Sequence, residues 1–200
     1  MIKKKKNKEN NNNNVLINLL FKAKNIYGEA LKNTNKDILP FIYGVRQNYV
    51  IINLKNISFF IKRIIKLIKF TIINNKKILI IGNSDDIKFL INKKFIKNNK
   101  NIIFFNKDWV NGLITNKITN TLINKKFNFL LIKEKIKLIL IIKSSINEKF
   151  LNKELSTLKI PTISLINTSQ NLININYPLI TNSRNIKPLY TLMYLLRKLF

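Results

Sequence analysis

The arrangement of this chain is clearest from Phe104–Asn116, FFNKDWVNGLITN, a stretch near its middle. The run Asn101–Phe105, NIIFF, leads into it, and the polar residues and Gly112 that follow are typical of a strand that ends in a loop. Thr115 and Asn116, at the end of the stretch, are residues that cap helices. We therefore expect a strand, a loop and then a helix here.

The loop in this stretch is also the first candidate for a binding site. Partners of an open parallel sheet bind at the loops that follow the carboxyl ends of its strands. An amide-rich loop flanked by Lys107 and Lys117 suits a polyanion. Trp109, the one Trp of the chain, fits either a contact with that partner or an anchor that packs the loop, and both interpretations stay open.

Strands and helices are predicted to alternate along most of the chain. A polar loop is expected at 27–37, and Pro40 and Gly44 bracket an irregular segment. The predicted strands are Tyr49–Ile52, Lys77–Ile81, Asn101–Phe105, Ile136–Ile142 and Thr162–Ile166, with an edge piece at Tyr177–Ile180. The predicted helices are Val15–Lys24, Lys55–Ile73, Asp85–Lys97, Thr115–Lys126, Glu148–Leu158 and Arg184–Leu199. This alternation predicts a three-layer α/β fold with a parallel sheet covered by helices on both faces.

The segment Lys55–Ile73 is the strongest helix prediction, because Ile57, Ile61, Ile64 and similar apolar residues recur at helical spacing. Basic residues occupy the other faces of this helix. The pattern favours a helix that covers a sheet and has a solvated basic side, since strands flank it in the sequence. A helix that lies on a membrane surface has the same pattern, so a peripheral membrane protein is an alternative.

Charge points to the class of partner. The 200 residues include 37 Lys and Arg against 9 Asp and Glu, which gives a formal net charge of +28. AT-rich genomes encode more Lys, Asn and Ile, but this bias in composition does not explain the scarcity of acidic residues. A chain with this charge repels itself and attracts a polyanion, so the composition predicts a nucleic-acid partner. With 46% hydrophobic residues, the body of the chain is expected to fold around a core.

The residue types missing from the sequence exclude several kinds of site. The chain has no Cys and no His, so disulfides, thiolate or imidazole metal sites and catalysis by a Cys nucleophile or a His base are ruled out. The turn at Gly82, GNSDD, matches neither common Gly-rich phosphate-binding motif. Asp85 and Asp86 in that turn would repel a phosphate. A Rossmann-like nucleotide-binding enzyme is therefore the weaker alternative, and no cofactor or small-molecule substrate is expected.

Residues 1–14, MIKKKKNKENNNNN, have no apolar periodicity and are expected to form a disordered basic arm. One α/β domain is expected over residues 15–200. No apolar segment typical of a signal peptide follows the lysines, and no run approaches the ~20 residues that span a bilayer. If the protein acts in an organelle, we expect it to be made there.

Several stretches together resemble the small-subunit ribosomal protein S2 family, from about Leu20 to Leu196. Trp109–Asn116, WVNGLITN, resembles the family's W-x-G-G-x-L-T-N stretch, and Lys77–Asn83, KILIIGN, resembles its strand that ends in a Gly turn. Leu19–Gly28, Ile38–Leu54 and Ile160–Ser183 resemble its N-terminal helix, its YIYG segment and its IPVIALVDTN close. All four Gly of the chain fall where the family has Gly: Gly28, Gly44, Gly82 and Gly112.

The chain also departs from the family pattern. Ile26 and Glu29 stand where the family has His residues, and Asn111 replaces the first Gly of the Trp stretch. Acidic positions are lost at 167–169 and 181–183. Only residues 117–135 separate the Trp109–Asn116 stretch from the next strand. The family inserts a long helical hairpin, a coiled coil, at this place, and we expect the hairpin to be reduced here.

The resemblance implies a flavodoxin-like fold and a structural role in the small ribosomal subunit, with ribosomal RNA and other small-subunit ribosomal proteins as partners, no membrane and no catalytic residues. AT-type composition and the trimmed hairpin favour an organellar protein, mitochondrial before plastid, with the cytoplasm of an AT-rich bacterium as the alternative. RNA contacts are predicted around the carboxyl rim of the sheet and, as auxiliary contacts, at Arg184 and in the arm. The predicted RNA-binding residues are Arg46, Lys107, Trp109, Asn111, Thr115, Asn116, Lys117, Arg184, Lys3, Lys4, Lys5 and Lys6.

Overall fold

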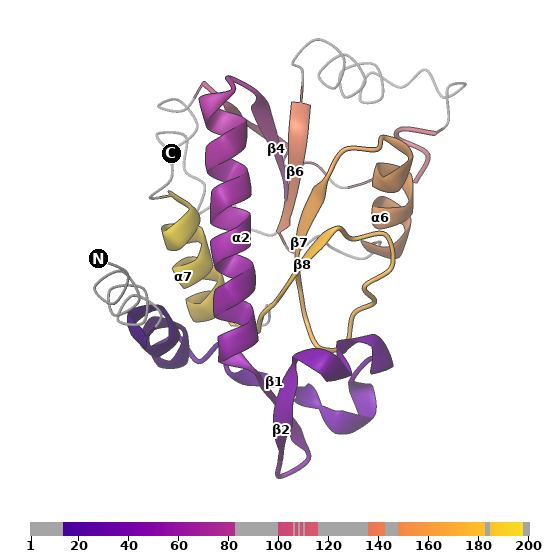
Figure 1. The fold of residues 1–200 in the computed structure, drawn as a ribbon. Coiled ribbons are helices and arrows are strands. Elements are labelled where there is room, and N and C mark those ends of the chain that lie inside the picture. Colours follow the sequence, from indigo (N-terminus) through magenta and orange to yellow (C-terminus); the bar gives the residue numbers. More distant parts are fainter. Residues whose placement is uncertain are drawn as a thin grey trace. The chain divides into compact units, whose positions relative to one another are not determined.

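The computed structural model of the chain (Figure 1) describes residues 14–82, 100–105, 107, 109, 111–115, 136–142, 148–182 and 185–197. These residues belong to two compact units. The N-terminal unit runs to Arg63 and includes Ile166–Asn171 and Leu179–Lys198, and the sheet unit consists of Ile64–Leu165, Leu172–Pro178 and Leu199–Phe200. The expectation of one domain over residues 15–200 stays a prediction. Of the basic arm expected at 1–14, residues 1–13 lie outside the described residues and Asn14 is helical.

A five-stranded sheet has the order β5-β4-β6-β7-β8. Its strands are β4 (Lys77–Ile81), β5 (Ile102–Phe105), β6 (Ile136–Ile142), β7 (Thr162–Ile166) and β8 (Tyr177–Ile180). β4 pairs in parallel with β5 and β6, and β6 pairs in parallel with β7. In chain order this is the 2-1-3-4-5 arrangement of flavodoxin-like folds. The predicted α/β class is confirmed, as is the placement of β8 at the edge.

Both faces of β4 are buried, which explains its continuous apolar sequence. Leu79 and Ile81 pack in one cluster with Leu151 of helix α6 (Glu148–Thr157). Ile78 and Ile80 point to the opposite face, because side chains alternate along a strand, and they too are buried. The strands lie between α6 and helix α2 in Figure 1, so three layers form as predicted.

Helix α2 spans Leu54–Ile73 and confirms the strongest helix prediction. The side-chain Oδ1 of Asn53 accepts a hydrogen bond from the Lys55 amide at 3.1 Å, as expected of a helix cap. Its isoleucine stripe is buried, whereas basic residues such as Lys66 lie on the exposed side. The solvated basic face agrees with the predicted sheet-covering helix. None of the helices in the described ranges is long and apolar enough to cross a membrane.

The N-terminal unit contains a second, antiparallel sheet with the order β1-β3-β2. Its strands are β1 (Tyr27–Ala30), β2 (Ile42–Arg46) and β3 (Tyr49–Ile52), with the short 3-10 helices η1 (Leu31–Asn33) and η2 (Lys36–Phe41) between β1 and β2. Gln47 and Asn48 form the β2–β3 turn with φ values of 48° and 64°. Two consecutive residues with positive φ are typical of the tight hairpin turns that match strand twist.

Three sequence predictions for this region are wrong. Tyr49–Ile52 is a strand, but it belongs to the antiparallel sheet and not to the parallel one. The polar loop expected at 27–37 contains β1, and the irregular segment expected between Pro40 and Gly44 overlaps β2. Both strands are short and carry register shifts in their pairing with β3, which disrupts the alternation from which strands are recognised.

The remaining helices follow the predictions where the structure describes them. Residues 14–22 are helical, α6 ends at Thr157, and helix α7 spans Ile186–Arg197 within the predicted Arg184–Leu199. The helix expected at Asp85–Lys97 lies outside the described residues. Thr115 is in a turn, and the rest of the helix expected to follow it also falls outside them.

Candidate nucleic-acid interface

The loop after β5 is anchored by its Trp. Trp109 is 8% exposed, and its ring meets that of Phe105 edge to face, with centroids 6.2 Å apart and planes at 73°. Leu113, four residues on, is also buried, and both side chains join the core cluster that contains Leu79 of β4 and Leu155 of α6. The environment of Trp109 therefore favours the packing interpretation over a ring that stacks on a partner.

Glu154 of α6 fixes the other side of this loop. The Gly112 amide donates to Oε1 of Glu154, and the Ile114 amide donates to Oε2 at 3.3 Å. Gly112 has φ of 85°, a conformation that L side chains rarely adopt. Glu154 is 8% exposed, so both hydrogen bonds are partly shielded from water. Charge-assisted hydrogen bonds of this kind are among the stronger ones. One carboxylate thus holds a distant loop on the helix.

Anchoring by Trp109, Leu113 and Glu154 leaves the polar loop residues that the structure describes on the outer side of the loop. Lys107, Asn111 and Thr115 are exposed. They follow the carboxyl end of β5, at the rim where partners of such sheets bind. The structure therefore brings three of the predicted contact residues together, and their contact with RNA stays a prediction.

The other predicted contact residues are not part of this group in the described structure. Arg46 is exposed, but it ends β2 of the antiparallel sheet, so its assignment to the rim of the parallel sheet was wrong. The remaining predicted contacts lie outside the described residues: Asn116, Lys117, Arg184, Lys3, Lys4, Lys5 and Lys6.

A polar network that the sequence did not indicate holds β1 in place. The Glu29 amide donates to Oγ1 of Thr168 at 2.8 Å, and the Asn35 amide donates to the Thr168 carbonyl at 2.9 Å. A Cβ on Gly28 would lie 2.9 Å from Cγ2 of Thr168, which explains a residue without a side chain there. Nδ2 of Asn167 also donates to Oε1 of Glu29 at 3.4 Å. The antiparallel sheet is thus fixed to the 167–168 turn.

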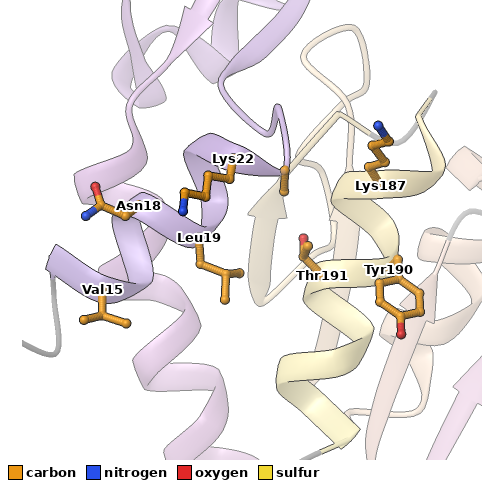
Figure 2. A pocket seen from close by; sticks show the side chains of 8 residues that line it. Val15, Asn18, Leu19, Lys22, Lys187, Tyr190 and Thr191 are labelled. Carbon is orange, nitrogen blue, oxygen red and sulfur yellow. The ribbon is translucent and has the colours of Figure 1, made fainter.

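The N-terminal unit also has a groove of about 630 Å³ between the helix at 14–22 and α7 (Figure 2). It is lined by Val15, Asn18, Leu19, Lys22, Ala23, Lys187, Tyr190 and Thr191. These lining residues include no carboxylate, so they offer no paired acid and base of the kind used in hydrolysis or proton transfer. In the part of the chain that the structure describes, no group of three or more His, Cys, Asp or Glu could hold a metal ion.

Comparison with known proteins gives one consistent result. The family model described as Ribosomal protein S2 matches residues 20–136 of the chain, which include the antiparallel sheet, β4, β5 and the Trp loop. Two curated proteins called small ribosomal subunit protein uS2 are similar, with 28% identity for the one from Ehrlichia chaffeensis and 29% for the one from Ehrlichia canis, over 129 residues. The alignments cover 64% of this chain and 41% and 40% of those relatives, so the chain matches about two fifths of their length.

Proposed function

This chain belongs to the ribosomal protein S2 family, and from that premise we propose that it is a structural constituent of a small ribosomal subunit. The family match over residues 20–136 is the observation that carries the proposal. Both curated relatives bear the name of a small-subunit protein. The net charge of +28 supports a polyanionic partner, and RNA is the polyanion that such a particle contains.

The loop after β5 that contains Trp109, which we call the Trp loop, supports binding through the RNA backbone. A folded RNA is recognised mainly by its shape and by contacts to phosphates and sugars. Lys107 offers a cation, and Asn111 and Thr115 offer hydrogen-bonding groups, on a loop that Trp109 and Glu154 hold in one conformation. A loop fixed before binding loses less conformational entropy when it binds. Lys117, Arg184 and the lysines of the arm are proposed to add further phosphate contacts.

The proposed role needs no catalysis by this chain, and neighbouring ribosomal proteins are its other proposed partners. We place the protein in an organellar ribosome, mitochondrial before plastid, because of its AT-type composition. The relatives found by comparison are bacterial, so an AT-rich bacterium is the competing location.

Sedimentation tests the proposal directly. The tagged full chain is followed through sucrose gradients of lysates from cells that make it, at rising salt concentration. Co-sedimentation with small subunits at low salt, and release at high salt, is expected because the lysines displace counterions from phosphate. Finding the chain free in a low-salt lysate, beside small subunits that lack it, would overturn the proposal.

A further inference from the structure

The central strand β3 of the antiparallel sheet has one side toward the core and one toward solvent. Along β3, Val50 and Ile52 are buried, whereas Tyr49 is 57% exposed. Residues opposite each other on antiparallel strands point to the same side of the sheet. Tyr49 pairs with Arg46 of β2, and Ile51 pairs with Tyr27 of β1. Tyr27, Tyr49 and Arg46 therefore share the outer face, which we call the tyrosine face.

The tyrosine face is open at Gly44, on the edge strand β2. Gly44 also pairs with Ile51 on this side, and a Cβ placed on Gly44 would meet nothing within 4 Å. Tyr27 is 50% exposed. Two accessible phenol rings thus lie on the same side of the sheet as an open glycine backbone, an arrangement on which a planar ring can rest. The β2–β3 hairpin extends past the N-terminal end of α2 in Figure 1.

The charge around this face favours an anion. Within the described residues of the N-terminal unit, the only carboxylate side chains are those of Glu29 and Asp37. Glu29 is buried and accepts a hydrogen bond from Asn167, so its charge is not presented at the surface. Arg46 is exposed at the end of β2. Aromatic rings and Arg also occur at protein interfaces, but the excess of cations over exposed carboxylates matches RNA better.

Resting on the proposed function above, we propose that the tyrosine face is a stacking platform for unpaired RNA bases. Tyr27 and Tyr49 stack on the bases, and Arg46 contacts a phosphate of the same strand. Single-stranded nucleotides are recognised through exposed aromatic rings on sheets, and stacking tolerates any base because each base has a π-face. This site would read unpaired nucleotides, whereas the Trp loop would contact the sugar-phosphate backbone.

The test uses the full chain and a labelled short uridine oligonucleotide, with an RNA duplex of equal length as the second probe. Replacing both tyrosines, Tyr27→Leu with Tyr49→Leu, is expected to weaken binding of the single strand about tenfold for each ring lost. The Phe pair, Tyr27→Phe with Tyr49→Phe, keeps the rings and should bind within about twofold of the parent. Tyr190→Leu, an exposed tyrosine of α7, is the matched control and should have no effect.

Two further readouts separate stacking from misfolding. The Leu pair should leave binding to the duplex and the thermal unfolding midpoint unchanged, because its side chains remain on the solvent face. Arg46→Gln should lower the salt dependence of single-strand binding by about one counterion, whereas the Leu pair should not.

Each other result overturns the inference. A folded Leu pair that binds the single strand as tightly as the parent removes the stacking role, and a Phe pair as weak as the Leu pair assigns binding to the hydroxyls. If the Leu pair loses a cross-link that the parent chain forms to a neighbouring small-subunit protein, but binds RNA as tightly as the parent, the tyrosine face is a protein interface. In all three cases the parent chain still co-sediments with small subunits, so the proposed function would stand.

Discussion

The two sheets of this protein differ in how far the faces of their strands are buried. In the parallel sheet, Ile78–Ile81 of β4 are buried on both sides, and helices cover the strands. In the antiparallel sheet, Val50 is fully buried while its neighbour Tyr49 is largely exposed. A strand buried on both faces can contribute to binding only through the loop that follows it, whereas a half-exposed strand presents its own side chains.

If the proposed RNA contacts are correct, this difference separates a buried scaffold from a contact surface within one chain. The parallel sheet positions the Trp loop at its rim, and the exposed residues among those described in this loop are polar: Lys107, Asn111 and Thr115. The antiparallel sheet presents rings and a cation directly on strands. Substitutions should therefore reduce stability most in the parallel sheet and affect binding most on the tyrosine face.

The largest expected effect on stability is in the parallel sheet. Leu79→Ala removes a fully buried side chain from the core cluster and should lower the free energy of unfolding by about 2–5 kcal/mol. Urea unfolding followed by the fluorescence of Trp109 measures it. Ile51→Ala, on the partly exposed face of β3, is the matched control and should cost less than half as much. Equal losses would contradict the distinction between the two sheets.

The next effect concerns the attachment of the Trp loop to α6. Glu154→Ala leaves the partly buried amides of Gly112 and Ile114 without their acceptor, which should cost about 1–3 kcal/mol. Hydrogen exchange at these two amides should accelerate, and the emission of Trp109 should shift toward that of a solvated ring. Glu154→Gln retains one carbonyl acceptor and should show a smaller loss. Unchanged exchange in the Ala variant would show that Glu154 does not hold the loop.

A pair of glycines tests the same contrast at the backbone. Gly112→Ala places a side chain at φ of 85° and should cost about 1–2 kcal/mol. Gly44→Ala adds a methyl group to open space on the tyrosine face and should change stability by less than about 0.5 kcal/mol. Thermal unfolding compares the two variants. A Gly44→Ala loss as large as that of Gly112→Ala would mean that the outer face is not open.

The smallest expected effect on stability is at the rim. Lys107→Gln should leave the free energy of unfolding within about 0.5 kcal/mol, because the side chain is exposed. It should lower the slope of RNA affinity against salt by about one. Titrations of the full chain with RNA at several salt concentrations measure that slope. Thr157→Ser, at the end of α6, keeps the charge unchanged and serves as the control. An unchanged slope for Lys107→Gln would remove this residue from the proposed interface.

The sequence predicted the strongly periodic elements of the fold and failed where periodicity was interrupted. Helix α2 is long, and strands β4 and β6 are apolar except for one Lys each, so the hydrophobic pattern alone located them. β1 and β2 are four and five residues long, and each has a register shift against β3. Such strands are defined by their partners, which a local pattern cannot show.

The candidate site was predicted only in part for a similar reason. Lys107, Asn111 and Thr115 were found because they follow a strand end. The role of Glu154 could not be read from the sequence, since its partners Gly112 and Ile114 are 42 and 40 residues away. Nor did any local signal place Tyr27 and Arg46 on one face, because their common neighbour is β3.

The sequence by itself determined the α/β class, the excess of positive charge and the absence of thiol and imidazole chemistry, because composition and periodicity are properties of the chain alone. The tertiary structure decided which way Trp109 points, which carboxylate holds its loop, and which tyrosines share a surface. These depend on pairing between distant segments, and pairing is set by the packing of the whole unit.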